Sequence, residues 1–264
     1  MRSDFETLKL ERVGDHVLLV TLNRPEVLNA TNTTMGRERL ELFGGLYVDQ
    51  EDVRCIVLTG AGQRAFSAGG DLKERKGMSD ADWRRQHAIF EQGAMALKQC
   101  PVPVIAAVNG VAYGGGCETV LSCDFAYASS TATFALTEVR IGILPGTMGT
   151  QQLPRAVGER RAREILMTGM PFTAEEAFAW GMVNRVCEPD RLLEEALETA
   201  SVIAGNAPLA VQRIKRAAGV AGDLDLASGF QFELEAYNRL VVTEDRQEGV
   251  NAFNEKRKPQ FRGR

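Results

Sequence analysis

The stretch PVIAAVNGVAYGGGCETVLS, residues 103–122, decides how the middle of the chain folds. It opens within an apolar, β-rich run at residues 102–108 and passes through Gly114-Gly115-Gly116 into the apolar Thr119-Val120-Leu121. Because glycine adopts backbone angles that other residues avoid, the run predicts a tight turn from a strand into a helix. The free N–H groups in the first turn of that helix could hold an oxyanion. A plain turn without a ligand explains the glycines equally well.

Segments upstream of this turn alternate between strand-like and helix-like patterns. Residues 8–13 and 16–22 predict a hairpin that turns at Gly14-Asp15. Residues 54–59 predict a further strand, and residues 34–46 and 80–99 predict helices. Strands separated by helices favour parallel βαβ units, so we expect an α/β core.

The pattern changes after about residue 145 and is mostly helical from residue 155 onward. We therefore expect the α/β core to be followed by a helical C-terminal region. This region could pack on its own core or on a neighbouring subunit. The predicted helices of this half are residues 159–167, 174–179, 191–204, 209–218, 224–240 and 244–253.

Composition limits the class of protein. The chain has 264 residues, of which 44% are hydrophobic and 25% charged, as in an ordinary globular protein. Its net charge of −4 argues against a dedicated nucleic-acid binder. No apolar stretch is long enough for a membrane span, and no signal peptide is visible at the N-terminus. The five cysteines form no CxxC pair, which favours a reduced protein, and we expect a cytoplasmic location.

Glu118 and Glu138 are the strongest candidates for chemistry, because both stand among apolar and small residues. Most glutamates lie on the surface. In these surroundings, however, partial burial would raise a carboxyl pKa, and two carboxyl groups in one pocket would titrate apart. The pair could therefore supply an acid and a base. A second glycine pair, Gly69-Gly70, could add a backbone donor, so that two N–H groups meet one carbonyl oxygen.

Other catalytic patterns are absent from the sequence. Neither His16 nor His87 has Cys or His neighbours at metal-ligand spacing, so no zinc site is expected. The chain has no GxSxG elbow, no Walker loop and no GxGxxG motif. Acid–base work is therefore assigned to carboxylates.

Taken together, these pieces resemble the enoyl-CoA hydratase/isomerase, or crotonase, family across nearly the whole chain. The resemblance implies a crotonase-like spiral of ββα turns over residues 1–200, which holds the CoA-binding and catalytic site. It implies a helical oligomerisation region over residues 201–264, and homotrimers that are often paired into hexamers. The matching stretches are residues 22–25, 28–30, 65–72, 103–118, 134–151 and 256–259.

The resemblance also assigns roles to single residues. Gly70 and Gly115 would donate backbone N–H groups to the thioester carbonyl of an acyl-CoA substrate and so form an oxyanion hole. Glu118 would act as the base on the attacking water, and Glu138 would deliver a proton to the α carbon. Neither a metal nor a redox cofactor is needed, since CoA is part of the substrate. Further substrate contacts are expected at Ala30, Ala68, Asp71, Leu72 and Met148.

Two positions depart from the family pattern, and one charged stretch lies near its pocket. Glu26 stands where relatives often carry a lysine that contacts a phosphate. Met148 is bulkier than the residue common at its position, and we expect it to reshape the acyl pocket beside Glu138. Residues 73–78 are expected to form either a mobile lid over the acyl chain or an ordinary surface loop.

The presence of both glutamates favours a 2-enoyl-CoA hydratase that forms 3-hydroxyacyl-CoA. Family isomerases often keep only the carboxylate at the Glu138 position. A Δ3,Δ2-enoyl-CoA isomerase or another acyl-CoA lyase of the family is therefore the alternative enzyme. Some members of the family bind RNA, and a catalytically silent scaffold is a further alternative. The acidic net charge and the intact glutamate pair argue against both of these.

Overall fold

Two β-sheets organise the chain in the computed structural model, which describes residue 2 and residues 4–264. The strands are β1 Leu8–Val13, β2 Val17–Leu22, β3 Cys55–Gly60, β4 Ala65–Ser67, β5 Val104–Val108, β6 Val111–Tyr113, β7 Phe125–Ser129, β8 Thr133–Ala135, β9 Phe172–Thr173 and β10 Arg185–Cys187. The larger sheet has the order β1-β2-β3-β5-β7-β10, and the smaller has the order β4-β6-β8-β9. Within the larger sheet, every pair except the β1–β2 hairpin is parallel.

Helices connect and cover these strands. The α-helices are α1 Thr33–Val48, α2 Leu72–Arg75, α3 Asp80–Gln99, α4 Gly115–Ser122, α5 Gly149–Val157, α6 Glu159–Thr168, α7 Ala174–Ala179, α8 Leu192–Ala204, α9 Pro208–Val220, α10 Leu226–Val241 and α11 Glu244–Asn254. Two short 3₁₀ helices are η1 Pro25–Val27 and η2 Glu138–Ile141.

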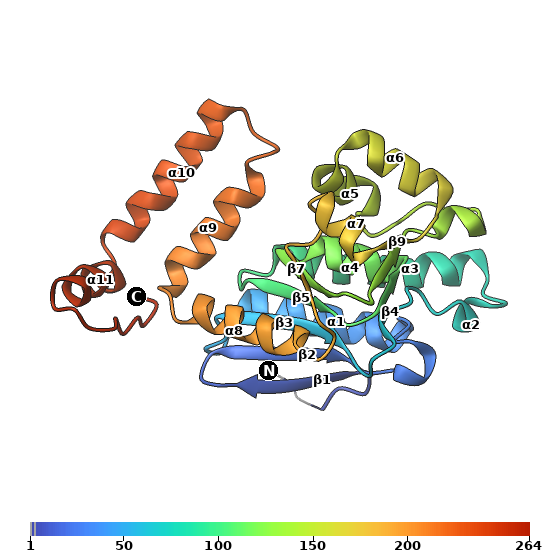
Figure 1. The fold of residues 1–264 in the computed structure, drawn as a ribbon, viewed down its shortest axis with the longest axis horizontal. Helices are drawn as coiled ribbons and strands as arrows, with labels where there is room; N and C mark the ends of the chain where they lie inside the picture. Colours follow the sequence, from blue (N-terminus) through green and yellow to red (C-terminus); the bar gives the residue numbers. More distant parts are fainter. Residues whose placement is uncertain (1, 3) are drawn as a thin grey trace.

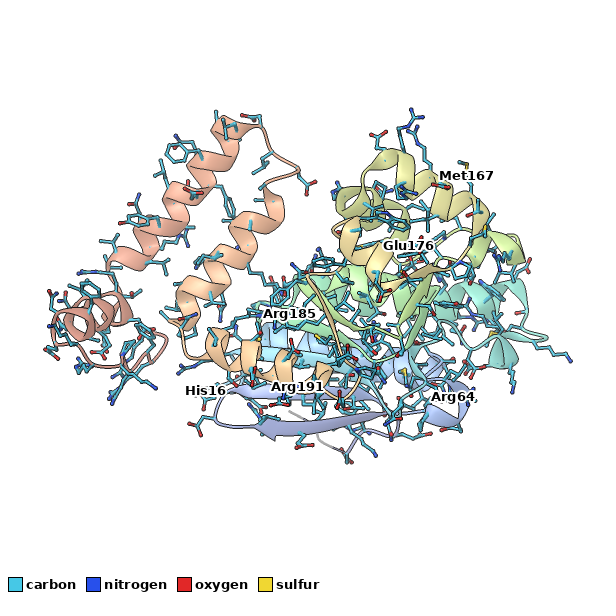
Figure 2. The ribbon with its side chains drawn as sticks, in the orientation of Figure 1. His16, Arg64, Met167, Glu176, Arg185 and Arg191 are labelled. Atoms are coloured by element: carbon cyan, nitrogen blue, oxygen red, sulfur yellow. The ribbon has the colours of Figure 1, made fainter. Side chains whose placement is uncertain are left out.

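The central strands are buried on both faces, as their continuous apolar runs indicate. Along β3, Val57 packs in one cluster with Leu192 of α8, whereas its neighbour Ile56 packs in a second cluster with Phe43 of α1. Helix α8 therefore covers one face of the larger sheet. Arg185 of β10 is labelled in Figure 2. It also reaches α8, where its Nη1 lies 2.9 Å from Oε2 of Glu195.

Most of the predicted elements are confirmed. The hairpin joins β1 and β2 in antiparallel register, and the helix predicted at residues 80–99 is α3 Asp80–Gln99. Ser79 caps α3 by accepting a hydrogen bond from the Asp82 amide. The mostly helical second half also contains β9 and β10, which were not predicted. At two and three residues, these strands are too short to display an alternating pattern.

The last three helices, α9, α10 and α11, extend away from the two sheets (Figure 1). Neither α9 nor α10 contains a buried residue. The expected boundary after residue 200 falls within α8, whose Ala200 and Ala204 still pack against the larger sheet. An oligomerisation role for residues 201–264 stays a prediction. Among the described residues, no helix combines the length and the apolar content needed to cross a bilayer.

Candidate active site

Two glycine-rich loops meet where α4 begins. Gly114 has a left-handed φ of +52°, and α4 starts at the next residue. A Cβ atom on Gly116 would lie 2.1 Å from the carbonyl oxygen of Ser67, so only glycine fits this close approach. On the other loop, a Cβ on Gly69 would lie 3.2 Å from the amide nitrogen of Gly115. The end of β4 and the start of α4 are therefore in backbone contact.

This contact brings the amides of Gly70 and Gly115 to one place. A Cβ built on Gly115 lies 4.0 Å from the Gly70 nitrogen, and both glycines line the same pocket. Gly115 is the first residue of α4, where an N–H group has no partner within the helix and the helix dipole is positive. The two N–H groups can therefore be donated together to a carbonyl oxygen that gains negative charge.

Glu118 lies in the first turn of α4 and is only 3% exposed. Its Oε1 accepts hydrogen bonds from the backbone amides of Thr147 and Gly149, both at 2.8 Å. Its Oε2 accepts a hydrogen bond of 2.6 Å from the Thr147 hydroxyl. Three donated hydrogen bonds fix the orientation of the Glu118 carboxyl group at the pocket wall.

Glu138 opens the short helix η2 and stands in the opposite environment. Its Oε2 is buried and has no hydrogen-bond partner among the described residues. Burial, and secondarily the nearby charge of Glu118, raises the pKa of Glu138 to about 7. A carboxyl group with this pKa holds a proton through part of the neutral range and can release it to a substrate.

The loop between these two acids has an unusual backbone. Met148 stands between the two residues that donate amides to Glu118, and its φ is +79°. A non-glycine residue in this left-handed region is uncommon, and here it lets two nearby amides converge on one carboxylate oxygen. Met148 caps α5 and does not itself line the pocket.

The structure brings six of the predicted site residues to one pocket: Ala68, Gly70, Leu72, Gly115, Glu118 and Glu138. Ala30 and Asp71 lie beside this pocket, and both accept hydrogen bonds from Arg24. Nη1 of Arg24 donates to the Ala30 carbonyl at 2.6 Å and to Oδ2 of Asp71 at 2.9 Å. Asp71 also caps α2 by accepting hydrogen bonds from the amides of Lys73 and Glu74.

Several pocket residues were not predicted from the sequence. Thr147, Arg39 and Arg75 line the pocket. The guanidinium of Arg75 lies 4.3 Å from the Trp83 ring centre, and its Nε donates to Gln86 at 2.7 Å. These contacts tie part of residues 73–78 to α3. Thr147 stands next to Met148, where only side-chain bulk was considered, and no sequence motif marks either arginine as a pocket residue.

This chain is similar in sequence to known proteins. The model of a family described as enoyl-CoA hydratase/isomerase matches residues 12–264. The short-chain-enoyl-CoA hydratase of Clostridium acetobutylicum is 42% identical over 249 residues, which cover 94% of this chain and 95% of that protein. The (E)-benzylidenesuccinyl-CoA hydratase of Thauera aromatica is 40% identical over 253 residues, which cover 95% of this chain and 97% of that protein.

A solved structure agrees with these matches. The crystal structure of an enoyl-CoA hydratase from Bacillus anthracis has a TM-score of 0.96 and 39% sequence identity. The matched region covers 98% of this chain and 100% of the chain in that crystal structure. The likeness confirms the predicted α/β fold, a crotonase-like spiral of ββα turns with a helical C-terminal region.

Proposed function

Because the chain belongs to the enoyl-CoA hydratase/isomerase family, we propose that it is a hydro-lyase acting on 2-enoyl-CoA thioesters. It adds water reversibly across the α,β double bond and gives 3-hydroxyacyl-CoA. The observation that carries this proposal is the contrast between two carboxyl groups in one pocket. Glu118 is held as an acceptor by three hydrogen bonds, whereas burial leaves Glu138 able to keep a proton.

Four residues have separate roles in the proposed reaction. The amides of Gly70 and Gly115 hold the thioester carbonyl oxygen and stabilise the enolate-like charge that develops on it. Glu118 takes a proton from the water that attacks the β carbon, and Glu138 gives its proton to the α carbon. Water addition transfers no electrons between protein and substrate, so the proposed steps use these groups without a metal or a redox cofactor.

The acyl group is not fixed by the family alone. The relatives named above act, by their names, on short-chain enoyl-CoA and on (E)-benzylidenesuccinyl-CoA, at nearly equal identity to this chain. The proposal for this chain is therefore a 2-enoyl-CoA thioester as a class. The expected cytoplasmic location and the absence of a nucleic-acid or membrane partner remain predictions beside it.

We also propose that the protein assembles as a homotrimer or as a dimer of trimers. The helices beyond α8 leave large apolar side chains in solvent, which is costly unless another surface covers them. Analytical ultracentrifugation would test this, and a monomer at micromolar concentration would contradict it. The most exposed large apolar residues beyond α8 are Leu226, Val242, Phe253 and Ile214.

Incubation of the purified protein with crotonyl-CoA tests the reaction directly. We expect the absorbance of the conjugated enoyl thioester to fall and 3-hydroxybutyryl-CoA to form. A Glu118→Gln variant should lose this activity, while Glu175→Gln, on the exposed surface of α7, should retain it. Conversion of a 3-enoyl-CoA to a 2-enoyl-CoA without any hydrated product would instead favour the isomerase.

A further inference from the structure

Arg39 is a cation inside the pocket without a matching anion. It lies on α1, is half-buried, and lines the same pocket as Glu118 and Glu138. Its Nη2 donates to the Thr119 hydroxyl at 3.0 Å, which is a neutral partner. Its Nε is buried and has no hydrogen-bond acceptor among the described residues.

No described carboxylate forms an ion pair with this guanidinium, although the charge of Glu118 partly offsets the effect of desolvation on the pKa of Arg39. The Glu38 carboxylate belongs to the residue that precedes Arg39 on α1. It accepts hydrogen bonds from the backbone amides of Glu6 and Thr7 and from the Thr7 hydroxyl. Glu118 already accepts three hydrogen bonds and forms no ion pair with Arg39 in the described chain. Desolvation lowers the pKa of Arg39, although an arginine stays protonated in proteins. A half-buried cation without an ion-pair partner is unfavourable, so this position gains stability when an anion binds.

The contact of Arg39 with α4 places its guanidinium near the oxyanion site. Thr119, which accepts from Arg39, donates in turn from its hydroxyl to the carbonyl of Gly115 at 2.7 Å. Two hydrogen bonds therefore connect Arg39 to the first residue of α4, and both Arg39 and Gly115 line the pocket.

Small residues of α1 and α3 line the pocket near the guanidinium. Gly36 of α1 and Gly93 and Ala94 of α3 do so together with Thr119 and Ser122. A Cβ on Gly36 would lie 2.5 Å from the Phe90 ring, so this ring bounds the pocket between α1 and α3. An acyl chain that follows this space ends against a positive charge rather than against a purely apolar wall.

We infer that the pocket selects acyl-CoA thioesters whose acyl chain ends in a second carboxylate. This specificity rests on the function proposed above. Arg39 would form an ion pair with that carboxylate and donate hydrogen bonds to it from Nε and a neighbouring nitrogen, in the side-on geometry that guanidinium groups favour. The ionised chain end would supply the anion that the pocket lacks. Arg39 is therefore a specificity residue and takes no part in the proton transfers.

Two other roles for Arg39 make different predictions. If Arg39 acted only on the charge of Glu118, its loss would change turnover equally for every substrate. If it contacted the CoA portion, its loss would weaken all thioesters equally. Only a carboxylate subsite makes the effect depend on the end of the acyl chain.

Calorimetric binding of saturated thioesters separates these roles without requiring turnover. Chain-matched pairs such as pentanoyl-CoA and glutaryl-CoA, hexanoyl-CoA and adipoyl-CoA, and octanoyl-CoA and suberoyl-CoA differ only in the terminal carboxylate. We expect one diacid thioester to bind wild type about 100-fold more tightly than its partner, as for a desolvated charge pair. Equal binding within all three pairs would overturn the inference.

Variants of α1 provide the control. Arg39→Met should reduce the preference to about onefold, and Arg39→Lys should retain part of it. Arg37→Met, on the exposed side of the same helix, should leave the preference unchanged. Equal weakening of both members of a pair by Arg39→Met would overturn the inference. If wild type prefers the diacid but hydrates no enoyl-CoA, the carboxylate subsite stands and the hydratase proposal fails.

Discussion

Glu118 and Glu138 line one pocket but differ completely in hydrogen bonding. Glu118 accepts three hydrogen bonds, whereas Oε2 of Glu138 has no partner among the described residues. Glu118 is therefore fixed by donors on both of its oxygens, whereas burial raises the pKa of Glu138 to about 7. The distinct proton-transfer roles proposed for the two side chains rest on this asymmetry.

Replacing Glu138 by glutamine should slow hydration strongly. The amide keeps the size of the protonated acid but has no acidic proton to give, so we expect kcat to fall by about 10²–10⁴ with little change in KM. Crotonyl-CoA turnover measures this, and Glu175→Gln is the surface control. A Glu138→Gln variant with wild-type turnover would remove this residue from the mechanism.

The activity should depend on a single ionisation near neutral pH. Hydration needs Glu118 charged and Glu138 protonated, so kcat/KM should fall as pH rises above about 7, the pKa of Glu138. The reverse dehydration also needs one proton on the pair, because the overall reaction consumes none. We therefore expect the same alkaline limb in both directions. A kcat/KM profile that stays level through this region would contradict the assignment.

Burial of Glu138 should also cost stability at neutral pH. Its pKa is raised from 4.5 to about 7 on folding. The unfolded chain therefore loses this proton first, and wild-type stability declines between those pH values and then levels off. Glu138→Gln lacks the penalty, so its free energy of unfolding should exceed that of wild type by on the order of 2 kcal/mol above pH 7, after allowance for solvent screening.

Urea unfolding of both proteins at a series of pH values measures this difference, with Glu175→Gln as the reference. The gap should be absent below the lower pKa and constant above the higher one. A gap that shrinks as the pH rises would reverse the sign of the argument and exclude Glu138 as its source.

An alanine at position 115 should block the oxyanion site without unfolding the chain. The added methyl group would have the Gly69 Cα at 3.9 Å and the Gly70 nitrogen at 4.0 Å as its nearest atoms, which is ordinary contact. It would, however, occupy the space where a carbonyl oxygen meets the two amides. We expect activity to fall by about 10²–10³ while the thermal midpoint changes little.

Gly44→Ala in α1 is the matched control, because its methyl group would meet nothing within 4 Å. It should keep full activity and gain slight helix stability. Gly115→Ala with normal turnover would show that the carbonyl oxygen binds elsewhere.

Much of the fold, and the two acidic residues that share the pocket, could be predicted from the sequence. The hairpin and α3 carry long patterns with clear caps, and Glu118 and Glu138 stand out because they are charged residues in apolar surroundings. Arg39 could not be found in this way. It alternates with Arg37 around Glu38, as on a solvated helix surface, and only the packing of α1 against α3 and α4 decides which arginine turns inward.

Asp71 shows a second limit of the sequence. The family resemblance implied a substrate contact for Asp71, which stays a prediction; in the structure its carboxylate caps α2 and pairs with Arg24. Arg24 lies 47 residues away in the chain, so this pairing depends on tertiary structure that no local pattern records.

The backbone conformation of Met148 supports the site, although its side chain does not line the pocket. The amides on either side of it reach the same oxygen of Glu118 because its backbone is left-handed. A β-branched substitute would resist that conformation, and relaxing it would withdraw both donors together. Natural or engineered losses of function should therefore cluster at this bend as well as among pocket side chains.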